Sequence, residues 1–335
     1  MKKNFLVLIV LCLFAVLIVA CSKEKKEATS NADLQKSVTV NTQAIEIQKP
    51  HPKEILQPNP PTRKPKAMTL LSSLVSKAPT IDGNGSEEVW RSAEAISTLD
   101  YISGRSVEIK SVHTKDRIYF LVRFPDVSPS TTHKSFGWDY HDKVYEQLND
   151  REDVFVFKWS LMGNDIDLSF SNPEPHQADV WFWKAKRTDP SGYSDDKIQT
   201  LQTVDNIELK KIPIPNKKGK FLYLERKGDT GKSAYHQEMI FEYQGDVKSQ
   251  FFAVQPSGSR ADVRAKGVWK EGFWTIEFAR KLDTGYPDDI QFKSGQVYLF
   301  GVATSELAFD DVHSEFSVPL FRSGDVFDRL FLQIK

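Results

Sequence analysis

Short segments with alternating side chains recur along the chain from about Ala78 onward, and helical periodicity is scarce. In the segment Arg117–Phe124, Ile118, Phe120 and Val122 alternate with residues of a second face, which is the period of a β-strand. Polar turns such as Thr114-Lys115-Asp116 separate neighbouring segments. The pattern predicts strands at Pro79–Ile81, Val107–Ser111, Arg117–Phe124, Asp153–Leu161, Val180–Trp183, Phe221–Leu224, Glu238–Tyr243, Val263–Trp269, Trp274–Arg280 and Val297–Thr304. With one short helical turn at 87–90, capped by Ser86, they predict an all-β, antiparallel β-sandwich.

The segment from Ala178 to Asp196 combines aromatic, cationic and turn-forming residues. In a strand, Trp181 and Trp183 lie on one face, whereas Phe182 and Lys184 lie on the other. A polar turn and the pair Asp195-Asp196 follow. This composition suits a site for a flat, partly anionic ligand. Alternatively, the tryptophans belong to the core and the charges to a solvated strand end.

The N-terminus has the features of a secretory signal peptide, predicted at residues 1–20. Two lysines precede an unbroken apolar run from Phe5 to Val19, which is too short to span a bilayer comfortably. The ending Ile18-Val-Ala-Cys21 resembles a bacterial lipoprotein lipobox. The resemblance implies cleavage before Cys21 and lipidation of this residue, which would anchor the chain to the bilayer of a bacterial cell envelope, facing the periplasm or the exterior. The alternative is an uncleaved anchor helix.

Cys12 and Cys21 are the two cysteines of the chain, so a processed and acylated chain would have no free thiol. This excludes disulfides, Cys-ligated zinc, iron–sulfur clusters and Cys-attached haem. Residues 21–78, polar and then proline-rich, read as a flexible tether, with 68–75 as its first docked piece. The folded domain is predicted at 79–335, and its balanced charge gives no indication of nucleic-acid binding.

Several blocks along the body resemble the haem-binding domain of ethylbenzene dehydrogenase gamma subunits and of related cytochrome c-552 and DMSO reductase-type proteins. They are Ile81-Asp-Gly83 with Val89-Trp90, Glu152-Asp-Val154, Asp179-Val-Trp-Phe-Trp-Lys-Ala185 with Gly192-Tyr-Ser-Asp-Asp196, Ala261-Asp-Val-Arg-Ala-Lys-Gly267, Trp274-Thr-Ile-Glu277, Asp288-Asp-Ile-Gln-Phe292 and Phe300-Gly-Val-Ala303. Family-nine carbohydrate-binding modules share the fold and the Ile-Asp-Gly/Trp opening.

The resemblance implies a non-covalent b-type haem between a Met sulfur and a Lys amine. It also implies electron transfer with a periplasmic molybdenum oxidoreductase or a cytochrome, without catalysis by this chain. The candidate iron ligands are Met162 or Met239 on one side and Lys184, Lys266 or His313 on the other. Trp181 and Trp183 would contribute to the same cofactor-binding region.

Two departures from the family pattern favour a second hypothesis. Phe182 stands where many members have His, and the cysteine-containing insertion of other members is missing before the Asp179 block. The chain could therefore be a haem-free relative that binds carbohydrate or protein. Its binding surface would then use Trp181, Trp183, Trp269 and Trp274.

Overall fold

The structure is a computed structural model, and it describes residues 64–100, 104–168, 173–206, 208–214, 217, 219–304 and 328–335. The predicted signal peptide, residues 21–63 of the predicted tether (with Cys21) and His313 lie outside these residues. No helix in the described part of the chain is long and apolar enough to cross a membrane.

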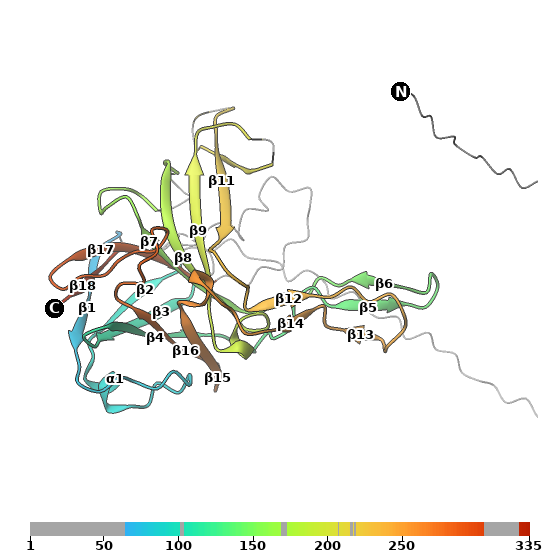
Figure 1. Cartoon of the computed structure of the whole chain (residues 1–335), viewed down its shortest axis with the longest axis horizontal. Helices are drawn as coiled ribbons and strands as arrows, with labels where there is room; N and C mark the ends of the chain where they lie inside the picture. The colour runs from blue at the N-terminus through green and yellow to red at the C-terminus, as the bar shows by residue number, and fades with distance from the viewer. Residues whose placement is uncertain are drawn as a thin grey trace, which may run out of the picture. The chain divides into compact units, whose positions relative to one another are not determined.

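Strands dominate the described residues (Figure 1). They are β1 (Ala67–Leu74), β2 (Ala95–Leu99), β3 (Ser106–His113), β4 (Arg117–Pro125), β5 (Phe136–Asp139), β6 (Val144–Gln147), β7 (Val154–Ser160), β8 (His176–Lys184), β9 (Asp195–Gln202), β10 (Lys210–Pro213), β11 (Phe221–Gly228), β12 (Tyr235–Gln237), β13 (Val247–Lys248), β14 (Phe251–Ala253), β15 (Arg264–Lys270), β16 (Phe273–Lys281), β17 (Val297–Ala303) and β18 (Arg329–Ile334). The short helices are α1 (Glu88–Ser92), η1 (Asp189–Ser191) and η2 (Ser259–Ala261).

The strands form a sandwich whose two layers belong to one continuous sheet. Its order is β10-β11-β9-β8-β7-β17-β18-β1-β3-β4-β16-β15, with β2 paired to β3. β1 runs parallel to β18 and to β3, and the other pairs in this sheet are antiparallel. The sheet folds back so that β4 and β16 face β7 and β8. Phe120 and Phe157 meet at 5.0 Å between ring centroids, and Trp183 and Trp274 also meet at 5.0 Å. The predicted all-β sandwich is thus confirmed.

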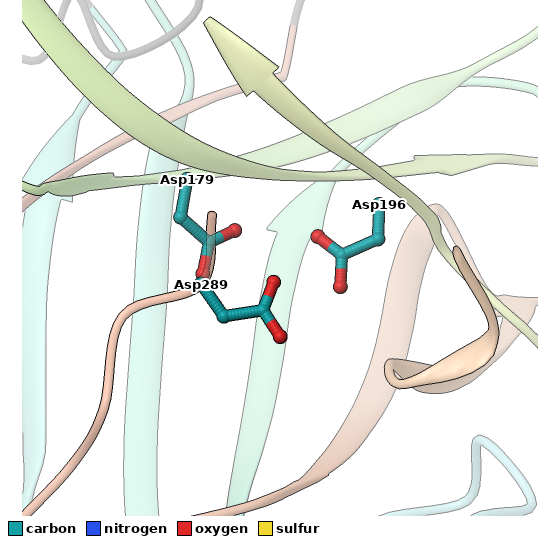
Figure 2. A group of neighbouring side chains, drawn as sticks. All are labelled: Asp179, Asp196 and Asp289. Carbon is teal, nitrogen blue, oxygen red and sulfur yellow. The ribbon is translucent and has the colours of Figure 1, made fainter. Parts of the chain in front are cut away.

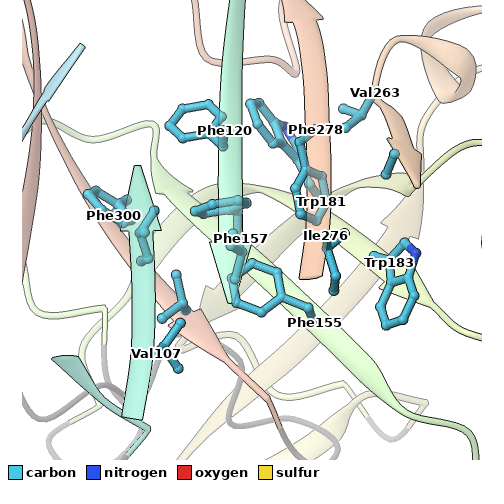
Figure 3. Packing of buried hydrophobic residues seen from close by; sticks show 14 of the residues in the cluster. Val107, Phe120, Phe155, Phe157, Trp181, Trp183, Val263, Ile276, Phe278 and Phe300 are labelled. Atoms are coloured by element: carbon cyan, nitrogen blue, oxygen red, sulfur yellow. The ribbon is translucent and has the colours of Figure 1, made fainter. Parts of the chain in front are cut away.

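Aromatic rings fill the space between the layers (Figure 3). Trp181 and Trp183 point into this core and are fully buried, as their shared strand face predicts. Phe182 points the other way and joins a second apolar cluster with Val154 and Val156 on the outer face of the sheet. Strand β8 is therefore covered on both faces, and this explains its nearly continuous run of apolar side chains.

The structure differs from the sequence prediction in several places. The strands β2, β5, β6, β9, β10, β12, β13, β14 and β18 are additional to the predicted ones. Residues 67–74, which lie in the predicted tether, form strand β1 and pair with β18. The folded body therefore starts about a dozen residues before the predicted boundary at 79. Residues 79–81 and 238–243 form no strand. The N-cap residue of α1 is Glu87 and not Ser86. The Glu87 carboxylate makes no capping hydrogen bond to the helix and accepts one from the backbone N–H of Thr80.

A separate set of short strands forms what we call the arm, residues 135–150 and 235–253 (Figure 1). β5 pairs with both β6 and β13, and β12 pairs with β14. Inside the arm, the ring of Trp138 lies 4.9 Å from that of Tyr145 and 5.2 Å from that of Tyr243. These aromatic contacts are separate from those between the sandwich layers.

Candidate functional site

The two tryptophans of the Asp179 block belong to the core and offer no ligand-stacking surface. Both are fully buried. The Trp183 indole donates to Asp189 Oδ1 at 2.9 Å, and its ring packs so closely against Gly267 that a Cβ there would lie 2.5 Å from the indole. Trp181 and Trp183 are therefore core residues, as the alternative hypothesis expects.

Lys184 lies on the outer face of β8 in a buried ion pair. Its Nζ is 2.6 Å from Asp195 Oδ2, and Asp195 also contacts Lys197 at 3.1 Å and Arg260 at 2.9 Å. Burial lowers the pKa of Lys184 to about 8, although the Asp195 charge opposes this shift. Burial alone would raise the pKa of Asp195, but the three cations outweigh it and hold this pKa well below its ordinary value.

The other candidate iron ligands are also engaged or exposed. Lys266 Nζ lies 2.5 Å from Asp189 Oδ2. Met162 is 55% exposed, and its sulfur accepts the backbone N–H of Gln177 at 3.3 Å. Met239 is 60% exposed and lies in the arm.

The strand register separates Met162 from the two lysines. Lys184 pairs with Val154, whereas Ser160, two residues before Met162, pairs with Ala178. Six residues of strand separate these two levels, which amounts to about 20 Å. Lys266 contacts Asp189, just beyond the Lys184 end of β8. A haem iron could therefore not be held between Met162 and either lysine, whereas Met239 lies in the arm and His313 lies outside the described residues.

A cluster of buried carboxylates occupies a different part of the sandwich (Figure 2). Asp179 comes from β8, Asp196 from β9 and Asp289 from the loop before β17. Each offers one oxygen, and these oxygens all lie within 4.8 Å of one another. Asp179 Oδ2 also accepts hydrogen bonds from Arg280 Nη1 at 2.6 Å and from the backbone N–H of Ile290 at 3.0 Å.

The register explains why two of these aspartates meet. β9 pairs Asp196 with Trp181, so Asp179 and Asp196 are diagonal neighbours on the inner face of the sheet. No local sequence pattern predicts this cluster, yet its three members belong to the blocks that carry the family resemblance. Those blocks were a signal that could have identified it.

Burial makes ionisation of the cluster costly. Burial, with the neighbouring carboxylates adding to it, raises the pKa of Asp196 well above its ordinary value. The same causes raise the pKa of Asp289 to about 7 and that of nearby Asp229 to about 8. Burial is also the main cause that raises the pKa of Asp262. Such a concentration of acid inside a fold requires protons, cations or both to offset it.

Comparison with known families assigns the chain. The family model described as ethylbenzene dehydrogenase matches residues 87–306, about two thirds of the sequence. The chain belongs to the ethylbenzene dehydrogenase family. The matched range contains the cluster, the Lys184–Asp195 pair and the arm.

Similar solved structures are distant. A family-nine carbohydrate-binding module from Caldicellulosiruptor kristjanssonii in complex with cellotriose is 10% identical, with a TM-score of 0.35, covering 80% of this chain and 95% of that one. A putative carbohydrate-binding protein from Bacteroides uniformis is also 10% identical, with a TM-score of 0.35, covering 81% of this chain and 100% of that one. Likeness at this distance does not indicate what the chain binds. Among curated proteins, none matches the chain.

In this member of the ethylbenzene dehydrogenase family, buried carboxylates join the sequence blocks that carry the family resemblance to one another through indole N–H groups. Glu277 Oε1 accepts from Trp90 Nε1 at 2.7 Å, and Asp153 Oδ2 accepts from Trp274 Nε1 at 2.8 Å. Asp189 Oδ1 accepts a hydrogen bond from Trp183 Nε1 in the same way. Burial raises the pKa of Glu277 to about 7, while its N–H donors oppose this shift. Packing and hydrogen bonding within the sandwich thus account for Trp90, Trp183 and Trp274.

Proposed function

We propose that this chain is a lipid-anchored, non-catalytic accessory subunit of the bacterial cell envelope, which works by docking to an oxidoreductase partner through its arm. Family membership supports the association with an oxidoreductase. The lipobox-like ending at Cys21 and the long polar and proline-rich stretch after it support a tethered position.

The exposed apolar side chains of the arm are the observation that carries the docking role. Fifteen large apolar side chains of the described residues are exposed, and eight of them lie in the arm: Tyr140, Val144, Leu148, Met239, Phe241, Tyr243, Val247 and Phe252. Exposed apolar side chains scattered singly are ordinary, whereas their concentration on one element is typical of a protein-binding surface. Aromatic residues and Met are also the residue types enriched at protein interfaces.

Phe241 is the most exposed of these side chains, at 80%. Interface energy concentrates in a few aromatic anchors, so one or two substitutions in the arm should be enough to disrupt docking. The double variant Phe241→Ser, Met239→Ser removes apolar surface that makes no contribution to the sandwich core. Val127→Ser is the matched control, because Val127 is 95% exposed and lies outside the arm.

The experiment is affinity purification of the tagged, full-length chain from detergent-solubilised envelopes, followed by mass spectrometry and an activity stain for oxidoreductases. We expect an oxidoreductase subunit to co-purify with the wild type and with Val127→Ser, and its recovery to fall at least tenfold in the arm variant. The same preparation should carry acyl chains on Cys21. Equal recovery with the arm variant would contradict docking through the arm, and an unmodified Cys21 would contradict the anchor.

A second candidate function is electron transfer through a non-covalent b-type haem. Family membership favours it, and so does the lowered pKa of Lys184, since an iron-bound amine must be neutral. Against it, Lys184 contacts Asp195 and Met162 lies at the far end of the strand. An absorption spectrum distinguishes the two functions.

A further inference from the structure

We propose that the carboxylates of Asp179, Asp196 and Asp289 bind one hard divalent cation, with Ca²⁺ as the preferred ion. This inference is independent of the proposed docking function. It rests on the geometry of the three side chains and on carboxylate oxygens that have no hydrogen-bond donor.

The arrangement of oxygens suits a Ca²⁺ ion. Figure 2 shows the three carboxylates turned toward a common space between β8, β9 and the loop before β17. Oxygen ligands of one Ca²⁺ lie 2.3–2.6 Å from the ion, so two of them can be no more than about 5 Å apart. The three oxygens here meet that limit, since they lie within 4.8 Å of one another. Carboxylates also select Ca²⁺, Mg²⁺ or Mn²⁺ over Zn²⁺ and Cu²⁺, which prefer nitrogen and sulfur ligands.

The unpartnered oxygens are the second observation. Asp196 is fully buried, and both of its carboxylate oxygens have no donor among the described residues. Asp179, its neighbour in the cluster, is itself a carboxylate, so a hydrogen bond between the two would require a shared proton. Asp229, which is also buried, has two oxygens without a donor, and its backbone N–H donates to the backbone carbonyl of Asp196. A buried polar group without a partner is costly, and a cation supplies the missing partner.

The excess of negative charge around the cluster also favours a bound cation. Five buried or partly buried carboxylates gather here: Asp179, Asp196, Asp229, Asp262 and Asp289. Arg280 supplies a positive charge, but it is bound to Asp179 and to the backbone carbonyl of Ile290. One divalent ion would offset part of the remaining negative charge and tie two strands of the sandwich to the loop before β17. Binding only to the folded state would then stabilise the body in proportion to the logarithm of the free ion concentration.

The test uses the purified, folded chain after dialysis against EDTA. Titration with Ca²⁺ should show one site per chain and raise the thermal unfolding midpoint by several degrees. Tb³⁺ in place of Ca²⁺ should show emission when tryptophan is excited, since Trp181 pairs with Asp196 across β8 and β9, and added Ca²⁺ should quench this emission.

Asp196→Asn keeps the side-chain volume and should abolish both responses, and Asp289→Asn provides a second variant if the first does not fold. Asp116→Asn is the matched control, because its carboxylate is 78% exposed, and it should respond like the wild type. An unchanged unfolding midpoint and no Tb³⁺ emission in the wild type would overturn the proposal in favour of protons shared among the carboxylates. Full Ca²⁺ and Tb³⁺ responses in both Asn variants would overturn it as well.

Discussion

Asp195→Asn should be among the most destabilising single substitutions in this chain, lowering the free energy of unfolding by about 3–5 kcal/mol, as expected when one partner of a buried ion pair is removed. Asp195 is fully buried and accepts contacts from Lys184, Lys197 and Arg260. Asparagine would leave these cations facing a neutral amide. Urea-induced unfolding, followed by tryptophan fluorescence, measures the difference.

Lys184→Met tests the other partner of this ion pair. It removes the buried charge and keeps most of the side-chain volume, next to the rings of Phe182 and Tyr235. Asp195 retains Lys197 and Arg260, so we expect less than half the cost of Asp195→Asn. Because the folded-state pKa of Asp195 is depressed, its stabilisation should be present above the unfolded pKa of about 4 and be lost as pH falls below it. Equal losses in the free energy of unfolding for Asp195→Asn and Lys184→Met at neutral pH would contradict the expectation that Asp195 is held by three cations.

Glu277→Ala should cost a similar amount, because three N–H groups lose their common acceptor. Glu277 accepts from the backbone N–H of Asp82 at 3.1 Å, from that of Gly83 at 2.7 Å and from Trp90 Nε1 at 2.7 Å. The donors of Gly83 and Trp90 are buried, and each orphaned buried donor costs about 1–3 kcal/mol, so we expect about 2–6 kcal/mol in total. The segment from residue 79 to Trp90 should also become sensitive to protease.

Glu277→Gln is the matched control for shape. Its amide has a single acceptor oxygen, and its NH₂ group would face a donor, so we expect an intermediate loss of stability. Wild-type stability and protease resistance in Glu277→Ala would show that other contacts hold this segment to the sandwich.

The longer core strands, such as β4, β7 and β16, could be predicted from the sequence, since period-two alternation is a local property. The alternation places Trp181 and Trp183 on one face and Phe182 and Lys184 on the other, as the structure has them. The proline-rich sequence before β1 favours a tether there, whereas the pairing of β1 with β18 joins residues more than 250 positions apart. No local pattern reports such a contact.

The candidate ligands were harder to predict, because a side chain's availability depends on its neighbours in space. Lys184 is engaged by Asp195, eleven residues later, through the register that pairs Phe182 with Asp195. Asp289 joins Asp179 from a loop more than a hundred residues away. The sequence contains both sets of residues, but only the topology determines which side chains meet.

If this family member works by binding a partner and its methionines and lysines do not hold a haem iron, the chain should carry no haem. The most direct measurement is the visible absorption spectrum of the full chain, purified from cells supplied with haem and recorded oxidised and reduced. We expect no Soret band, before or after reconstitution with haem. A Soret band that grows in proportion to protein and shifts on reduction would contradict this expectation and favour the electron-transfer function.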